Sequence, residues 1–282
     1  MAEAHRRGLI AALLVGVVFV APARADEAAL ADAIWQADRT GRVTPRVSVL
    51  EPDIDLDGAY RVQRILVDRR ITAGDGIAGY KNGLTGTLAK MWFGIDEPVF
   101  GVIPKSGLRR SGDAIVTPPG RRMLLETEIG LVAGARIDKP VADVAALKKL
   151  IRSVVPVVEI PAGGFREADA RKLTVTDIVA NNVSAAFLVA GTEIPVEGLV
   201  LKSVSATLSR DGKMLSDGTG ADTMGDPWRA ALWLVNVAVK RGRVVEPGHI
   251  LSTGVLGKRI ESAPGAYLAE FGPLGRIELT IR

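Results

Sequence analysis

The chain has 282 residues, a formal net charge of +4, no cysteine and only two histidines. The absence of cysteine excludes disulfides, thiolate nucleophiles and cysteine-ligated zinc, and the shortage of histidine argues against Ser–His catalysis and histidine-rich metal sites. Aromatic residues make up 5% of the chain and the basic residues are scattered, so the composition does not indicate a nucleic-acid-binding protein.

Residues 1–25 have the pattern of a secretory signal peptide. His5-Arg6-Arg7 is a short basic region, Leu9–Val20 is an uncharged apolar run, and Ala23-Arg24-Ala25 is a small-x-small cleavage site. The apolar run is short for a membrane span, and an uncleaved anchor is the alternative. Cleavage lowers the formal net charge from +4 to +2, and no long apolar stretch follows. We therefore expect a periplasmic or secreted protein with no membrane association after cleavage.

Segment 26–97 is predicted to form a helical N-terminal part. Apolar residues at helical spacing predict helices over 27–38 and 57–70, joined by a proline-containing connector. A strand is expected over Ile77–Leu84, and it places Lys81 among glycines. A lysine in that setting can act as an acid or base if its pKa falls, whereas an ordinary surface lysine is the alternative.

Segment 98–282 is predicted to form a β-rich body, which makes the fold class α+β. Two helices interrupt it, one over Val144–Arg152 and one from Pro227, with Asp226 as the cap and Gly242 at the end. The predicted strands are Val99–Ile103, Ala114–Val116, Leu124–Ala133, Val154–Ile160, Phe187–Ala190, Leu199–Leu208, Lys213–Leu215, Ile250–Thr253, Tyr267–Phe271 and Arg276–Arg282.

Three glutamates on these apolar strands are the candidate chemistry. Glu126 and Glu128 are two residues apart and therefore face the same side of a strand, and Glu159 ends a second apolar run. Adjacent carboxylates repel each other and are costly to bury without a partner. Waters and three carboxylates make an oxygen-rich site suited to Mg²⁺ or Mn²⁺. The alternative for the Glu126–Glu128 pair is a solvated strand face.

At this point several segments, in order, resemble one family. The chain is similar to the 2-keto-4-pentenoate hydratase and oxalocrotonate decarboxylase group of the fumarylacetoacetate hydrolase superfamily. The segments that carry the resemblance are Leu56-Asp57-Gly58-Ala59-Tyr60-Arg61-Val62-Gln63, Gly79-Tyr80-Lys81-Asn82-Gly83-Leu84-Thr85-Gly86, Phe100-Gly101-Val102-Ile103, Glu126-Thr127-Glu128-Ile129, Pro156-Val157-Val158-Glu159, Ile178-Val179-Ala180-Asn181-Asn182-Val183-Ser184 and Ile250-Leu251-Ser252-Thr253-Gly254. Their order and spacing together are more specific than any one of them.

The resemblance implies a mixed β-roll with a helical N-terminal part and a metal-dependent lyase, a hydratase or decarboxylase, acting on a small 2-oxo acid. It implies a homo-oligomer that uses Mg²⁺ or Mn²⁺. The residues that it implies for the site are Glu126, Glu128 and Glu159 as metal ligands, Lys81, Asn181 and Ser184 as catalytic residues, and Leu125 and Gly83 as substrate-binding residues.

The chain also departs from the pattern of the hydratases. Val99 stands where the family carries an acid before Phe-Gly, Asn181 where it carries Asp, Asp226 where it carries His, and Gly86 where it carries Ser. Water addition needs groups that orient the water, so these changes favour decarboxylation or tautomerisation over hydration. Two further alternatives are a non-catalytic periplasmic binder of keto or dicarboxylic acids and a C–C bond hydrolase.

Overall fold

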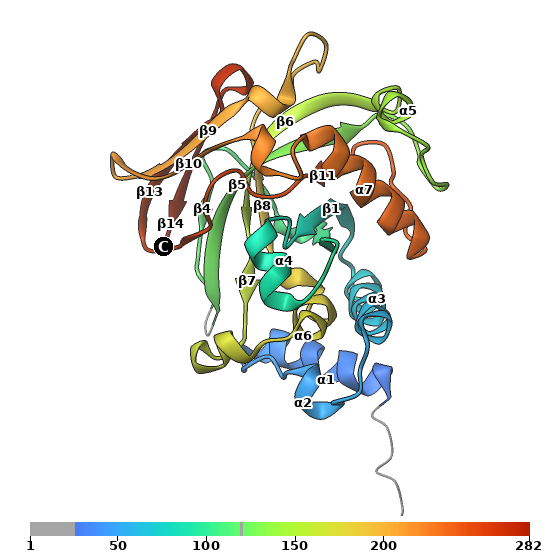
Figure 1. Cartoon of the computed structure of the whole chain (residues 1–282). Helices are drawn as coiled ribbons and strands as arrows, with labels where there is room; N and C mark the ends of the chain where they lie inside the picture. The colour runs from blue at the N-terminus through green and yellow to red at the C-terminus, as the bar shows by residue number, and fades with distance from the viewer. Residues whose placement is uncertain (1–25, 119–120) are drawn as a thin grey trace, which may run out of the picture.

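The N-terminal helices begin where an aspartate caps them. The computed structural model describes residues 26–118 and 121–282, so the predicted signal peptide lies outside the described residues. Helix α1 (Glu27–Thr40) follows Asp26, which accepts a hydrogen bond from Ala28 N, and α3 (Leu56–Thr72) follows Asp55, which accepts one from Gly58 N. Both predicted helices are confirmed. With α2 (Val47–Leu50) and α6 (Val175–Ala180) they form one end of the molecule (Figure 1).

The larger of two sheets occupies the middle of the molecule. Its main path runs β2-β1-β11-β5-β6-β8-β3, and the short strands β7 and β12 pair with β5. The strands are β1 (Ile77–Gly83), β2 (Val99–Pro104), β3 (Leu108–Arg110), β5 (Arg122–Ala133), β6 (Ile151–Ile160), β7 (Ala162–Gly163), β8 (Phe187–Ala190), β11 (Ile250–Ser252) and β12 (Ile260–Glu261). Because β1 lies in this sheet beside β11, the segment that carries Lys81 is joined directly to the β-rich body.

The second sheet has five strands in the order β10-β9-β13-β14-β4. Its strands are β4 (Ala114–Ile115), β9 (Ser205–Arg210), β10 (Lys213–Thr219), β13 (Gly265–Glu270) and β14 (Arg276–Ile281). The two sheets curl toward each other, and side chains from both, such as Leu125 and Ile277, share one buried apolar cluster (Figure 1). The predicted mixed β-roll with a helical N-terminal part is therefore confirmed.

The late helix α7 (Pro227–Lys240) covers β1 and β11 (Figure 1). It begins as predicted, with Pro227 in its first turn and the Asp226 carboxylate accepting a hydrogen bond from Trp228 N. Ala231, Leu234 and Val235 lie on its buried face. In the part of the chain that the structure describes, no helix is long and apolar enough to cross a membrane.

Two predicted elements differ markedly from the structure. Helix α5 (Val144–Lys148) stops short of Arg152, because β6 begins at Ile151, which pairs with Ala133 of β5. The predicted strand Leu199–Leu208 begins with a 3₁₀ turn, and only β9 is extended. Leu201 and Val204 are buried three residues apart, which suits the three-residue turn of a 3₁₀ helix.

Helix α4 (Thr87–Phe93) was not predicted. None of its residues is buried, and Leu88, Met91 and Trp92 are 81%, 72% and 64% exposed. Leu88, Met91 and Trp92 do have helical spacing, but a segment of seven residues is too short for an apolar period to identify a helix.

Candidate metal centre

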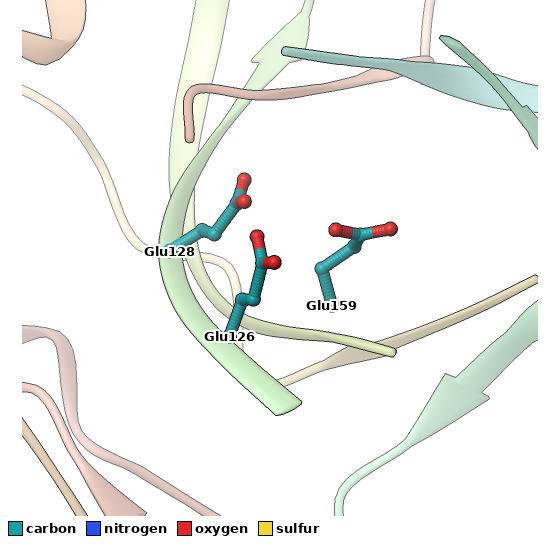
Figure 2. Close-up of side chains that lie close together, drawn as sticks. All are labelled: Glu126, Glu128 and Glu159. Atoms are coloured by element: carbon teal, nitrogen blue, oxygen red, sulfur yellow. The ribbon is translucent and has the colours of Figure 1, made fainter. Parts of the chain in front are cut away.

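Two neighbouring strands bring the three predicted ligands together. Strands β5 and β6 pair in an antiparallel register that sets Glu126 directly opposite Glu159, and Glu128 lies two residues further along the same face of β5. One carboxylate oxygen from each residue lies within 4.8 Å of the others, and Figure 2 shows the three side chains converging. Like charges directly opposite each other on adjacent strands destabilise a sheet, so this arrangement calls for a cation.

Burial makes the repulsion among the three carboxylates more costly. Glu128 and Glu159 are 0% and 1% exposed, and Glu126 is 7% exposed. Burial, followed by the neighbouring carboxylates, raises the pKa of Glu128 well above its ordinary value. Burial is also the first cause that raises the pKa of Glu159 to about 7, against the opposing effect of Lys81. Without a cation, the cluster therefore retains protons that isolated carboxyl groups would lose.

Glu128 shows most directly that the cluster suits a metal ion. Its Oε2 accepts hydrogen bonds from Ser252 Oγ at 2.5 Å and from Gly254 N at 2.8 Å. Its Oε1 is buried and has no hydrogen-bond partner among the described residues. A buried carboxylate oxygen without a donor is costly, and a cation ligated by oxygen satisfies it. Three carboxylate donors without histidine or cysteine suit Mg²⁺ or Mn²⁺, so the residues present fit the predicted ion.

Lys81 lies at the edge of the same cluster. Its Nζ donates to both carboxylate oxygens of Glu159 at 2.8 Å and to the Val183 carbonyl at 3.4 Å, and the residue is 2% exposed. Burial favours a lower pKa for Lys81, but the Glu159, Glu126 and Glu128 carboxylates outweigh it and raise the pKa. Three carboxylates and one ammonium carry a formal charge of −2 when ionised, which one divalent cation balances.

A left-handed turn forms the wall beside Lys81. Asn182, Val183 and Ser184 have φ values of 53°, 52° and 55°, a conformation that costs free energy for residues other than glycine and most for a β-branched valine. The Asn182 side chain holds this turn on β2, accepting from Val102 N and donating to Val102 O, both at 2.8 Å. Consecutive strained residues persist only where their surroundings hold them, which is typical of functional sites.

Glycines make room for this turn. A Cβ added to Gly83 on β1 would lie 2.5 Å from Val183 Cγ1, and one added to Gly101 on β2 would lie 2.9 Å from the Asn182 carbonyl. Val99 is opposite Gly83 in the β1–β2 register and is 1% exposed. The position at which the hydratases carry an acid is therefore filled by buried methyl groups packed near Gly83 and Val183.

The remaining predicted site residues are Gly83, Asn181, Ser184 and Leu125. Gly83 follows Lys81 on β1 and borders the left-handed turn, as described. Asn181 is buried at the end of α6, where its N–H donates to Asp177 O, and Ser184 closes the turn by donating its N–H to Asn181 O. Leu125 is fully buried in the apolar core on the face of β5 opposite Glu126, so its side chain points away from the carboxylates.

Sequence reasoning assigned no role to four groups at this site. Ser252 and the Gly254 N–H hold Glu128, and Asn182 holds the turn. Ser252 and Gly254 belong to a segment that resembles the family pattern, and that resemblance was the available signal. Arg259 lies with its Nε 3.9 Å from Glu126 Oε1.

A curled two-sheet fold with three convergent carboxylates on adjacent strands defines the class of the protein. The family model described as "Fumarylacetoacetate (FAA) hydrolase C-terminal" matches residues 82–281. The chain belongs to this family. The match begins one residue after Lys81, so the lysine is placed by the structure of β1 and not by the family model.

Individual relatives show which members of the family the chain is similar to. The 2-keto-4-pentenoate hydratase of Paraburkholderia xenovorans (strain LB400) is 33% identical over 247 residues, covering 86% of this chain and 89% of the relative. The 4-oxalocrotonate decarboxylase of Pseudomonas sp. (strain CF600) is 26% identical over 238 residues, covering 84% and 89%. The resemblance to the hydratase and decarboxylase group is thus confirmed, and both relatives are enzymes of the lyase type.

A solved structure supports the same fold. The 4-oxalocrotonate decarboxylase from Pseudomonas putida G7, complexed with magnesium and adipate, superimposes with a TM-score of 0.85 at 23% identity. The match covers 91% of this chain and 97% of that one. The two chains therefore share their architecture along nearly their whole length.

Proposed function

We propose that the protein is a divalent-metal-dependent lyase that acts on a small 2-oxo acid, with Mg²⁺ or Mn²⁺ as the cofactor. One observation carries the proposal: Glu126, Glu128 and Glu159 converge in a buried cluster in which Glu128 Oε1 has no hydrogen-bond partner among the described residues. Relatives named hydratase and decarboxylase support this reading, as does a structural relative solved with magnesium and a small dicarboxylic acid.

Glu126, Glu128 and Glu159 would hold the ion. When bound, it supplies a positive charge that polarises the carboxylate and 2-oxo oxygens of the substrate and stabilises negative charge on them. Ser252 and the Gly254 N–H keep Glu128 oriented. Such outer hydrogen bonds fix the geometry of a ligand and tune its affinity for the metal.

Among the lyase reactions, decarboxylation fits the proton-handling residues best. When the bond to CO₂ breaks, its electron pair stays on the 2-oxo acid as an enolate, and a proton must then reach carbon. Lys81 Nζ is an ammonium donor beside the cluster. Hydration also requires a group that orients water, and the acid that the hydratases carry for this region is replaced here by the buried Val99.

Turnover of candidate substrates tests the proposal. Purified protein with Mg²⁺ or Mn²⁺ is mixed separately with 2-hydroxypentadienoate, oxalocrotonate and oxaloacetate, and the loss of ultraviolet absorbance is followed. We expect turnover of oxalocrotonate that chelation abolishes and that Glu126→Gln reduces by at least 100-fold, whereas Glu261→Gln, an exposed carboxylate on β12, leaves it unchanged. Metal-dependent binding of 2-oxo acids without turnover of any of them would contradict the lyase and support the binding-protein alternative.

We further propose export of the protein and self-association. The basic, apolar and small-x-small pattern of residues 1–25 supports export, and α1 is capped by Asp26, the residue after the predicted cleavage site. The exposed Leu88, Met91 and Trp92 of α4 support a homo-oligomer. Intact mass of periplasmic protein tests the first proposal, because a soluble product that retains Met1 would contradict it. Light scattering tests the second.

A further inference from the structure

Arg259 lies at the edge of the metal centre, beside Glu126. It is the residue before β12, whose Ile260 pairs with Leu125, the neighbour of Glu126 on β5. Its Nε is 3.9 Å from Glu126 Oε1, and its side chain is 52% exposed. Within the described ranges its guanidinium donates no hydrogen bond at normal distance, so its five N–H groups remain available.

The position of Arg259 coincides with the accessible side of the cluster. Glu128 and Glu159 are 0% and 1% exposed, whereas Glu126, the carboxylate nearest to Arg259, is 7% exposed. The Glu126 side is therefore the side of the cluster that is least covered by protein. The closest approach of Arg259 to Glu126 is through Nε, which leaves the two terminal nitrogens for another anion.

The charge of the cluster indicates what this anion is. A divalent cation and the Lys81 ammonium together balance the three carboxylates, so Arg259 is a positive charge that the loaded cluster does not require. The planar guanidinium suits a carboxylate, which it binds through two parallel hydrogen bonds. A 2-oxo acid whose first carboxylate and oxo group are held at the cluster would present a second carboxylate toward the exposed side.

We propose that Arg259 binds the second carboxylate of the substrate and thereby selects dicarboxylic over monocarboxylic 2-oxo acids. The inference rests on the proposed function, because it requires 2-oxo acids to bind at the cluster. It makes Arg259 a specificity-determining residue of that site.

A matched pair of ligands tests the proposal. 2-Oxoadipate and 2-oxohexanoate have the same length and the same oxo-acid end, and differ in the second carboxylate. Calorimetric titration of the Mg²⁺-loaded protein is expected to give at least tenfold tighter binding of 2-oxoadipate. Arg259→Met should weaken 2-oxoadipate binding by about tenfold or more and change 2-oxohexanoate binding by less than twofold, and Arg259→Lys should recover part of the loss.

Arg122→Met is the matched control. Arg122 is also an exposed arginine at this corner of the sheet, but its Nε and Nη2 already donate to Glu261 at 2.8 and 2.5 Å. Removing its charge should leave the preference for 2-oxoadipate unchanged, which separates specific binding from general attraction. Mg²⁺ titration alone and thermal unfolding show whether each variant still folds and binds the cation.

Two results would overturn the inference. Equal losses for both ligands in Arg259→Met would mean that Arg259 acts on the oxo-acid end or on the metal site. An unchanged preference would mean that it contacts neither. These outcomes are independent of turnover: a protein that discriminates through Arg259 but converts no 2-oxo acid retains this inference and loses the lyase assignment.

Discussion

The two walls of the metal centre are built in opposite ways. The ligand strands, β5 and β6, place three carboxylates by regular antiparallel pairing, with Glu126 opposite Glu159. The lysine wall consists of β1, β2 and the left-handed turn at Asn182–Ser184, and it positions Lys81 through strained backbone and a side-chain clamp. Regular strands thus carry both the cation ligands and Lys81, and the irregular turn adds the Val183 carbonyl that accepts a hydrogen bond from Lys81 Nζ. At the lysine wall, activity should therefore depend on Asn182 as well as on Lys81, because Asn182 holds the turn on β2.

The largest effect is expected from removing a ligand on the first wall. Glu128→Gln replaces an anionic oxygen with a neutral amide in a fully buried position. Loss of partners outside the ligand set typically costs 10–100-fold in metal affinity, so loss of a ligand should reduce Mg²⁺ affinity by more than about 100-fold. Calorimetric titration with Mg²⁺ measures it, with Glu261→Gln as the exposed control. Affinity within threefold of the unmodified protein would show that the ion binds elsewhere.

Breaking the clamp tests the second wall. Asn182→Ala leaves the buried N–H and C=O of Val102 without these partners and places alanine at φ 53°. We expect a loss of about 3 kcal/mol in the free energy of unfolding, measured by urea denaturation, together with loss of activity at temperatures where the variant is folded.

Asn236 offers a matched control for that variant. It holds Val141 in the same way, accepting from its N–H at 2.8 Å and donating to its carbonyl at 2.9 Å, on α7 rather than in the left-handed turn. Asn236→Ala should also lower stability but should leave the activity of the folded protein unchanged. If the two variants lost activity equally, the turn would have no special role in positioning Lys81.

The stability of the metal-free protein should depend on pH, because the buried glutamates hold protons. Folding raises the pKa of Glu159 from 4.5 to about 7 and raises the pKa of Glu128 well above its ordinary value, chiefly through burial. An acid with a raised pKa stabilises the folded state while it is protonated, and this contribution disappears as pH rises from the unfolded value through the folded one. The metal-free protein should therefore lose stability between about pH 4.5 and 7.

Mg²⁺ displaces these protons, so its affinity should increase about tenfold per pH unit for each proton displaced. Titrations at pH 6, 7 and 8 would contradict this if the dissociation constants agreed.

The smallest effect is expected outside the ligand set. Ser252→Ala removes the 2.5 Å hydrogen bond to Glu128 Oε2 but leaves the one from Gly254 N. Mg²⁺ affinity should fall about tenfold, the lower end of the effect of such partners. Ser209→Ala, which removes a 3.3 Å hydrogen bond to Leu268 O on the second sheet, is the control.

The contrast between the ligand strands and the lysine wall also explains which parts of the site could be predicted from the sequence. The ligand strands follow a local rule, because residues two apart on a strand share a face, and so Glu126 and Glu128 could be paired without a structure. The roles of Asn182 and Ser252 depend on contacts across 80 and 124 residues, which no local pattern contains. Helix α4 was missed for a different reason: it has only seven residues, fewer than the window over which an apolar period can be recognised.

The alignment of Glu126 with Glu159 also has a consequence for how the chain folds. Strands β5 and β6 are joined by a long connection between Ala133 and Ile151, so no tight turn dictates how they line up. A slip of one residue would send Glu159 to the face opposite Glu126 and Glu128 and disperse the three oxygens. A divalent cation present during refolding therefore stabilises only the register that places Glu126 opposite Glu159. Metal binding should therefore increase the fraction of chains that refold with the native register of β5 and β6. Refolding from denaturant should give more native protein when Mg²⁺ is in the buffer.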